Sequence, residues 1–368
     1  MSTEAPDQRF DLVYLLTDGF GGHGGIALYN RDMLAALAAG GRTIVAVPRI
    51  AGPFDERLPD GLAWRAQGAR SLGKWVRESL HAALQARRGA PVFAAHVNLL
   101  PVAALAKLLT GGPLVLALYG TEAWTPPSSR LRRWALSMVD EVYSISQVTL
   151  DRFLAWTHFD PARSVILPNA IHLDAYGEAG RDEALARRLG LGNGPNLLIF
   201  GRMHPTERQK GFDELLEALP LIRDRNPGTM LVLAGDGGDR PRLERKAAEL
   251  GLSDHVRFTG RVEEAEKAAL YRLADAYVMP SYQEGFGFVH LEAMACGTPA
   301  VASDLDGARE AVREGRIGTL IDPHDPASIA AGVDAALAQG RGVPDGLAYF
   351  AFPAFAQRVQ DWLKRIRR

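Results

Sequence analysis

Two glutamates, Glu284 and Glu292, stand eight residues apart in the segment YQEGFGFVHLEAMACGTPAVAS, residues 282–303. Glu284 falls in the loop after a strand-like run, whereas Glu292 falls on the helix that follows. Their carboxylates are therefore predicted to reach different parts of one extended ligand. Because a carboxylate accepts hydrogen bonds well from neighbouring hydroxyls, the expected partners are the hydroxyls of a sugar and of a ribose. The alternative is an ordinary strand–loop–helix turn with two solvated glutamates.

The backbone around Glu284 is suited to binding an anion. The preceding strand ends at Met279–Ser281, and Gly285 and Gly287 allow a ligand to approach the main chain closely. The helix is expected to begin near Phe288 and to end at Gly297. Its free amide groups and positive dipole end predict binding of an anion such as a diphosphate.

A second pattern, FGRMHPTERQKGFDELLEALPLI over residues 200–222, places two cations between a strand and a helix. Arg202 ends the strand and Lys210 precedes the helix. Open α/β sheets bind their ligands at the carboxyl ends of strands. Arg202 and Lys210 are therefore predicted to neutralise a diphosphate leaving group. The alternative is a pair of surface cations in a loop.

A third pattern is the glycine-rich loop GGHGG, residues 21–25, between a strand and a helix. A dinucleotide-binding fingerprint would need an acidic residue near the end of the second strand to hold a ribose. That strand ends instead at Pro48–Arg49, which disfavours a hydride-transfer enzyme. A glycine-rich loop alone is a weak signal, and an ordinary turn is the alternative.

These loops belong to a chain in which strand-like apolar runs alternate with helical patterns, which predicts an α/β fold with parallel sheets. The junction near 170–180 is polar and strand-free, so two domains are expected: 1–172, 173–350, and a C-terminal helix over 351–368. The predicted strands are 11–17, 43–48, 92–98, 114–120, 141–146 and 164–171, then 196–202, 230–237, 256–262, 276–281 and 299–303.

Composition narrows the partners and the compartment. The net charge of −1 over 368 residues disfavours nucleic acid, because phosphate-binding proteins usually carry a large positive excess. Cys296 is the only cysteine, which excludes an intramolecular disulfide and fits a reducing compartment. The first ten residues are polar, and no apolar run is long enough to span a bilayer. A cytoplasmic protein is expected, with binding to a membrane surface left open.

Two helical segments have faces that need a partner. Residues 73–88, GKWVRESLHAALQARR, place Val76, Leu80, Ala83 and Leu84 on one side, beside Trp75, in a region where basic residues dominate. Such a helix can rest on anionic lipid, or its apolar face can pack on the domain core. The basic residues of 61–110 are Arg65, Arg70, Lys74, Arg77, Arg87, Arg88 and Lys107, against Glu78 alone.

The C-terminal segment PAFAQRVQDWLKRIRR also has one apolar helical face. This helix is predicted either to cross back to the first domain or to cap the second. The face consists of Phe355, Val359, Trp362, Leu363 and Ile366.

At these motifs the chain resembles the retaining glycosyltransferases of family 4, whose GT-B fold has two Rossmann-like domains facing each other across a cleft. The match covers most of the chain and is densest over 196–312. It rests on the E-x7-E pattern EGFGFVHLE and on GRMHPTERQKG. LAGDGGDRPRLERKAAELGLSDHVRFTGRV over 233–262 and LYGTEAW over 118–124 are also similar to family segments.

The resemblance implies a role for each motif. Glu284 would contact the donor sugar, Glu292 the ribose, and Arg202 and Lys210 the diphosphate. Three further groups of backbone would surround the donor. These are the amides of Gly285, Phe286, Gly287 and Phe288, the base-side turn that includes Arg261 and Val262, and Gly24 and Gly25 from the first domain.

One position departs from the family. Tyr119 stands where the family often has a histidine beside the donor sugar. Tyr119 is predicted to keep a hydrogen-bonding role in catalysis, with His96 and Glu122 as alternative polar groups on the acceptor side. A histidine such as His96, on an apolar stretch, is also commonly a core residue with its hydrogen bonds satisfied.

The predicted reaction moves a hexose-type sugar from a UDP- or GDP-linked donor to a hydroxyl of a saccharide or lipid-linked acceptor. The resemblance implies retention of configuration and no metal or other cofactor. Asp304 and Asp306 superficially form the paired-aspartate pattern of a metal site, whereas Asp322, His324 and Asp325 form an ordinary turn around Pro323. Neither set has the spacing of a metal-binding site. The alternatives are a GT-B epimerase or sugar-phosphate synthase, and a non-catalytic nucleotide-sugar-binding module.

Overall fold

A computed structural model describes residues 9–366 of the chain. They form two compact units. Unit 1 contains the residues up to Ala170 and those from Phe352 on, and unit 2 contains Ile171–Ala351. The C-terminal helix therefore belongs to the first unit, which is one of the two placements that its apolar face allowed.

Unit 1 is built on a parallel sheet with the strand order β3-β2-β1-β4-β5-β6-β7. Every neighbouring pair of strands is parallel, so all the strand ends that carry loops toward a ligand lie at one edge. The strands are β1 (Leu12–Leu16), β2 (Ile44–Pro48), β3 (Leu62–Trp64), β4 (Val92–Ala94), β5 (Leu114–Leu118), β6 (Glu141–Ser144) and β7 (Ser164–Ile166).

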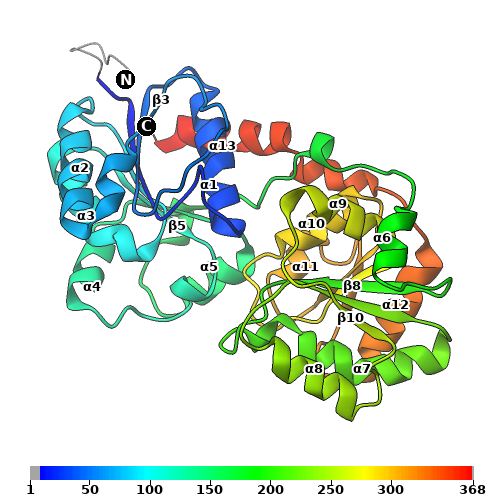
Figure 1. Ribbon diagram of the computed structural model, residues 1–368. Helices are drawn as coiled ribbons and strands as arrows, with labels where there is room; N and C mark the ends of the chain where they lie inside the picture. Colours follow the sequence, from blue (N-terminus) through cyan, green and yellow to red (C-terminus); the bar gives the residue numbers. More distant parts are fainter. Residues whose placement is uncertain (1–8, 367–368) are drawn as a thin grey trace. The chain divides into compact units, whose positions relative to one another are not determined.

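Helices flank this sheet (Figure 1). The red helix α13 (Phe352–Ile366) lies against the blue helix α1 (Gly25–Ala38), and the side chain of Trp362 meets Tyr143 in the core at a ring-centroid distance of 5.5 Å. Helices α2 (Leu72–Gln85), α3 (Leu100–Thr110) and α4 (Arg130–Leu136) follow one another along a single side (Figure 1). Helix α5 (Gln147–Leu154) also belongs to this unit.

Unit 2 repeats the architecture with the parallel strand order β10-β9-β8-β11-β12-β13. Its strands are β8 (Asn196–Phe200), β9 (Met230–Ala234), β10 (Val256–Phe258), β11 (Ala276–Met279), β12 (Ala300–Ser303) and β13 (Thr319–Ile321). Its helices are α6 (Glu183–Arg188), α7 (Phe212–Arg225), α8 (Arg240–Glu249), α9 (Glu264–Leu273), α10 (Phe288–Ala295), α11 (Ala308–Ala311) and α12 (Pro326–Gln339).

The alternating pattern predicted the central strands, and the structure adds one short strand at an edge of each sheet. β3 and β13 have three residues each and a polar or interrupted surrounding sequence, so they carry no clear periodic signal. The predicted strand 92–98 is shorter than expected, because it ends at Ala94 and Val97–Leu99 forms a 3₁₀ turn.

The apolar face predicted for the basic helix α2 is buried in part, because Ala83 is buried and Val76 packs against the core of unit 1. Trp75 is its buried anchor, and its indole N–H donates to the carbonyl of Val47 at 3.2 Å. Leu84, predicted on the same apolar face, is 63% exposed. The large indole sets the helix rotation, because burying it removes more apolar surface from water than burying one leucine.

Strand order locates the natural ligand positions of both units. In such sheets a ligand binds where the chain order reverses, at the carboxyl ends of the two strands on either side. In unit 1 the reversal lies between β1 and β4, and in unit 2 between β8 and β11.

Candidate donor-sugar site

The reversal point of unit 2 brings together two of the predicted catalytic residues. Lys210 comes from the loop after β8 and Glu284 from the loop after β11, and Lys210 Nζ lies 3.3 Å from Glu284 Oε2. Burial alone would raise the pKa of Glu284, but the charge and hydrogen bond of Lys210 hold that pKa below its ordinary value. Glu284 is therefore an ionised acceptor at neutral pH and not a proton donor.

Backbone contacts fix these two loops against each other. The amide of Tyr282 donates to the carbonyl of Gln209 at 3.1 Å. Gly211 has φ 88°, and a Cβ there would lie 2.4 Å from the carbonyl oxygen of Pro280. Glycine is required at this position both by its dihedral angle and by the closeness of the second loop.

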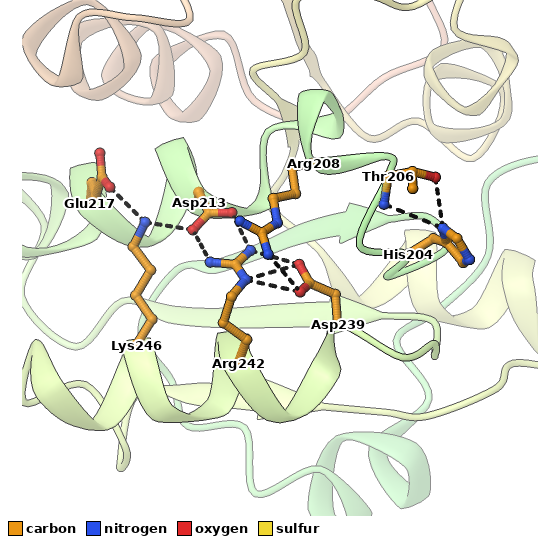
Figure 2. Close-up of polar contacts among 8 residues, drawn as sticks. All are labelled: His204, Thr206, Arg208, Asp213, Glu217, Asp239, Arg242 and Lys246. Atoms are coloured by element: carbon orange, nitrogen blue, oxygen red, sulfur yellow. Dashed lines mark hydrogen bonds and ion pairs between the residues drawn. The ribbon is translucent and has the colours of Figure 1, made fainter.

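An ion-pair network attaches the loop that contains Arg208 and Lys210 to helices α7 and α8 (Figure 2). Arg242 on α8 donates to both carboxylate oxygens of Asp213 at 2.7 and 2.5 Å and also binds Asp239. The guanidinium of Arg208, in the Lys210 loop, lies 3.5 Å from Asp239. Hydrogen bonding from Arg242 lowers the pKa of Asp239. The spacing of these residues along the chain gave no sign of this network, because it joins three separate elements.

Arg202, the other predicted diphosphate ligand, pairs with Glu207 and not with Glu284. Its side chain is 78% exposed and binds Glu207, a residue of the same loop, at 2.5 Å. A long exposed side chain changes rotamer at little cost, so its role in binding a diphosphate stays a prediction.

Glu292 is buried, with 1% of its surface exposed. Its two carboxylate oxygens accept hydrogen bonds from the hydroxyls of Tyr176 and Tyr271, each at 2.7 Å, and Lys267 Nζ lies 3.5 Å away. Burial and the charge of Glu292 together raise the pKa of Tyr271. These three partners come from the start of unit 2 and from α9, too far along the chain for a motif to reveal them.

The Gly285–Phe288 turn has the conformation that the sequence predicted. Helix α10 begins at Phe288, and Gly287 before it has φ 83°. A Cβ on Gly287 would lie 2.6 Å from Nδ1 of His290, so only glycine fits. Phe286 is buried against Phe350 at a centroid distance of 5.6 Å, which fixes the turn to the core. No hydroxyl or charge of Phe286 or Phe288 is available to a ligand, so their predicted contribution is through the backbone.

Arg261 and Val262 follow β10, at the edge of the same sheet. Arg261 is exposed and lies 3.5 Å from Glu263, whereas Val262 packs on the core. Two strand spacings, about 10 Å, separate β10 from β8. An extended ligand along this edge would thus meet the predicted sugar, diphosphate and base contacts in order.

In unit 1, Gly24 and Gly25 begin α1 beside the reversal point. Gly24 has φ 91°, and a Cβ on either glycine would meet no atom within 4 Å. These glycines therefore border open space, and the left-handed dihedral angle of Gly24, not crowding within the unit, requires its residue type.

The Tyr119 side chain, for which a hydrogen-bonding role in catalysis was predicted, is buried in unit 1. It is 6% exposed, and its hydroxyl donates to Oδ1 of Asn30 at 2.8 Å inside the core of unit 1. Asn30 also accepts from Tyr14 at 3.1 Å. This buried network commits the Tyr119 hydroxyl to holding α1 on the sheet, because an unpaired buried hydroxyl would be costly.

Glu122 and His96 stand at the carboxyl ends of β5 and β4. Glu122 Oε1 accepts from the backbone amides of Tyr119 and Gly120 at 2.7 and 3.1 Å. His96 Nδ1 accepts from the amide of Asn98 at 3.1 Å, and burial lowers the pKa of His96. A neutral imidazole beside Glu122 has one ring nitrogen left for a ligand.

Within residues 9–366, no group of three or more His, Cys, Asp and Glu side chains has an arrangement that could hold a metal ion. Asp306 instead binds backbone amides. Asp322 accepts from the amide of His324 at 2.8 Å, and Asp325 caps α12. The carboxylates of Asp306, Asp322 and Asp325 thus have structural partners.

Two family profiles match successive parts of the chain. "Glycosyltransferase Family 4" matches residues 23–175, and "Glycosyl transferases group 1" matches residues 182–344. The first match includes Gly24 and Gly25 of the glycine-rich loop and the β4–β5 region, and the second includes Arg202, Lys210, Glu284 and Glu292.

Several curated proteins are similar over part of the chain. A D-inositol 3-phosphate glycosyltransferase of Geodermatophilus obscurus is 42% identical over 190 residues, which are 49% of this chain and 41% of that protein. A GDP-mannose-dependent alpha-(1-6)-phosphatidylinositol monomannoside mannosyltransferase of Mycolicibacterium smegmatis is 36% identical over 211 residues, 55% of this chain and 54% of that protein. The matches thus span about half the length of these relatives.

Solved structures match nearly the whole chain. The Anabaena protein HepE in complex with UDP has a TM-score of 0.75 at 22% identity, covering 96% of this chain and 100% of that one. The lipopolysaccharide outer core galactosyltransferase WaaB has a TM-score of 0.71 at 16% identity, covering 96% and 99%. With both family profiles and the parallel sheets of the two units, these likenesses show that the chain belongs to the group 1 glycosyltransferases of the family 4 type and has the GT-B fold.

Proposed function

We propose that this chain is a retaining glycosyltransferase that moves a hexose-type sugar from a UDP- or GDP-linked donor to a hydroxyl. The observation that carries the proposal is the Lys210–Glu284 pair at the reversal point of unit 2, held 3.3 Å apart by two mutually bonded loops. A cation for a leaving phosphate and an ionised acceptor for sugar hydroxyls are the two groups that this chemistry needs at one place.

In the proposed step, the bond between the anomeric carbon and the β-phosphate oxygen breaks while the acceptor oxygen attacks from the same face. The departing phosphate takes the proton of the acceptor hydroxyl, and Lys210 and Arg202 neutralise the charge that develops on the diphosphate. Glu284 orients and stabilises the donor sugar and forms no covalent bond. No metal or other cofactor enters this step.

The acceptor is proposed to be a saccharide or lipid-linked hydroxyl, in polysaccharide or glycolipid assembly. Unit 1 has a pocket of about 470 Å³ at the carboxyl ends of β4 and β5. Its lining combines Arg132 and Glu122 with the indole of Trp156, a mixture of charge, hydrogen-bonding groups and aromatic surface suited to a polar ring. Two of the similar proteins act, by their names, on inositol-containing acceptors.

A donor panel tests the function directly. Incubation with UDP-glucose, UDP-galactose, UDP-N-acetylglucosamine and GDP-mannose is expected to release UDP or GDP from one donor. Release should rise several-fold when the matching acceptor is added and should survive EDTA. Loss of activity in EDTA, restored by Mn²⁺ or Mg²⁺, would contradict the metal-independent mechanism.

The same assay separates the alternative functions. An epimerase would change the sugar without consuming an acceptor, and a sugar-phosphate synthase would require a phosphorylated sugar as acceptor. A non-catalytic binding module would bind UDP or GDP and release none from any donor. The described Lys210–Glu284 geometry favours catalysis over silent binding, because a binding module has no need to neutralise a leaving group.

We further propose that unit 1 rests on an anionic membrane surface during transfer. Helices α2, α3 and α4 lie side by side in unit 1 (Figure 1), and their exposed residues, here termed the outer face, include leucines and a tryptophan among cations. Leu108 is 63% and Trp134 43% exposed, and each well-placed cation adds about 1 kcal/mol of attraction to anionic lipid. The exposed residues of this outer face are Leu84, Leu105, Leu108, Leu109, Leu131 and Trp134, with Lys74, Arg77, Arg130 and Arg133 and with Arg88, which follows α2.

Liposome co-sedimentation tests this surface. Binding is expected with vesicles of phosphatidylcholine and phosphatidylglycerol, and it should fade with salt because the charges are solvent-exposed. Replacing Lys74, Arg77 and Arg88 by Gln should weaken binding by about tenfold or more. Replacing Arg187, Arg225 and Arg245, exposed cations of unit 2, should leave it unchanged. Equal loss in both triple variants, or no binding at low salt, would contradict the proposal.

Within residues 9–366 no helix is long and apolar enough to cross a bilayer.

A further inference from the structure

Asp306 is fully buried, and its carboxylate accepts three hydrogen bonds. Its Oδ2 accepts from the backbone amide of Glu284 at 2.7 Å and from the hydroxyl of Ser281 at 2.8 Å. Its Oδ1 accepts from the amide of Ala308 at 3.0 Å, at the start of α11. One carboxylate thus joins the end of β11, the Glu284 loop and the segment after β12.

The neighbouring glycine completes a two-sided attachment. The amide of Gly307 donates to the carbonyl of Glu284 at 2.9 Å, so both backbone polar groups of Glu284 bind the Asp306–Gly307 pair. A Cβ on Gly307 would lie 2.1 Å from the carbonyl oxygen of Gly285, which requires the absence of a side chain. The main chain of Glu284 therefore has a single position relative to this pair.

We propose that Asp306 is a positioning residue for the transfer reaction, because its carboxylate fixes the backbone from which the Glu284 side chain reaches the donor sugar. The proposal rests on the proposed function of Glu284. Asp306 does not touch the donor in this role, and the pair Asp304–Asp306 has no part in binding a metal.

The surroundings of Asp306 make its charge costly to bury. Burial raises the pKa of Asp306 to about 6, although its hydrogen bonds to the amides of Glu284 and Ala308 and to Ser281 lower it. The charge of Glu284, itself paired with Lys210, adds to the increase. His290, from α10, faces Glu284, and burial lowers the pKa of His290, which keeps its ring neutral. In the segment that contains Asp306, the nearby cation Arg309 is paired with Glu314 at 2.6 Å.

The direction of the pH effect follows from these groups. Because the pKa of Asp306 in the folded protein lies above its ordinary value of 3.8, its stabilising contribution is fully present below about pH 4 and is lost as pH rises through about 6. At neutral pH the ionised carboxylate of Asp306 thus lowers the stability of the folded protein, although it accepts all three hydrogen bonds. As pH falls through about 6, Asp306 gains a proton and its oxygens accept these donors less well, so turnover is expected to fall.

The kinetic test compares Asp306→Asn with the matched variant Asp304→Asn, two residues away. Turnover of the active donor in Asp306→Asn is expected to fall on the order of 10- to 100-fold, because a small displacement of a positioned group has effects of this size. The Kd for UDP or GDP alone should stay unchanged, and the acidic limb near pH 6 should disappear from the kcat profile. Asp304→Asn should retain both the rate and the limb.

A second readout does not depend on turnover. In ¹⁵N-glutamate-labelled protein, the amide resonance of Glu284 is expected to shift with a midpoint near pH 6 and to lose that transition in Asp306→Asn. A transition present while no donor is turned over would refute the glycosyltransferase function but retain the attachment. A Glu284 amide resonance that does not shift near pH 6 would overturn the positioning role. An unchanged kcat profile in a folded Asp306→Asn variant would overturn it as well.

Discussion

Replacing Lys210 by Ala is expected to lower kcat on the order of 10²-fold or more while the protein stays folded. The ammonium group is the cation that lies beside Glu284, and removing one preorganised stabilising group from a developing anion has an effect of this size. The variant also leaves Glu284 without its ion-pair partner, so the pKa of Glu284 should rise toward its ordinary value or above. Single-turnover release of UDP or GDP measures the loss.

A matched control is Arg225→Ala, which removes a cation from the other end of the helix that Lys210 precedes. Arg225 binds Asp334 at the surface, so its removal should leave the rate unchanged. Arg202→Ala is predicted to resemble Lys210→Ala if Arg202 exchanges Glu207 for the diphosphate. Near-normal turnover in Lys210→Ala would remove this residue from the mechanism.

Replacing Glu284 and Glu292 by Gln, one at a time, is expected to affect different kinetic and binding constants. Glu284→Gln should lower kcat on the order of 10²-fold and leave the Kd for UDP or GDP nearly intact, because its ligand is the sugar. Glu292→Gln should weaken nucleotide binding about tenfold or more, since a hydrogen bond to a charged group contributes about 1.5–3 kcal/mol. Isothermal titration with UDP and GDP, beside donor turnover, separates the two effects.

The buried position of Glu292 requires a control for structural damage. Tyr271→Phe removes one of the hydroxyls that hold Glu292 but keeps the carboxylate and the ring packing. If Glu292 binds the ribose, Tyr271→Phe should weaken nucleotide binding less than Glu292→Gln does. Equal loss of nucleotide affinity in Glu284→Gln and Glu292→Gln would contradict the division of roles.

Local sequence was sufficient where a signal lies within one loop or one element. The strand ending before Glu284, the glycines after it and the start of α10 at Phe288 are set by neighbours a few residues apart, and the structure has them where they were predicted. The apolar face of α13 was likewise visible as a helical repeat, and its Phe355, Val359, Trp362 and Leu363 are buried.

Contacts between distant elements were beyond the reach of such patterns. Glu292 is separated by 116 residues from Tyr176, so spacing alone predicted an open carboxylate where the structure has a buried one. The interior position of the Tyr119 hydroxyl depends on Asn30, 89 residues away. The exposure of Leu84 depends on which face of α2 the indole of Trp75 occupies. Each of these outcomes is decided by packing across the fold.

The return of α13 to unit 1 makes unit 2 an insertion within the sequence of unit 1. The two ends of the insertion lie side by side, since Ile171 pairs with Ala351 and its amide donates to the carbonyl of Phe350 at 2.8 Å. Unit 2 is consequently one continuous segment of the chain, residues 171–351, which a single internal deletion would remove. Unit 1, by contrast, consists of two segments separated by unit 2. A truncation from the C-terminus would therefore first remove α13, which is part of the core of unit 1.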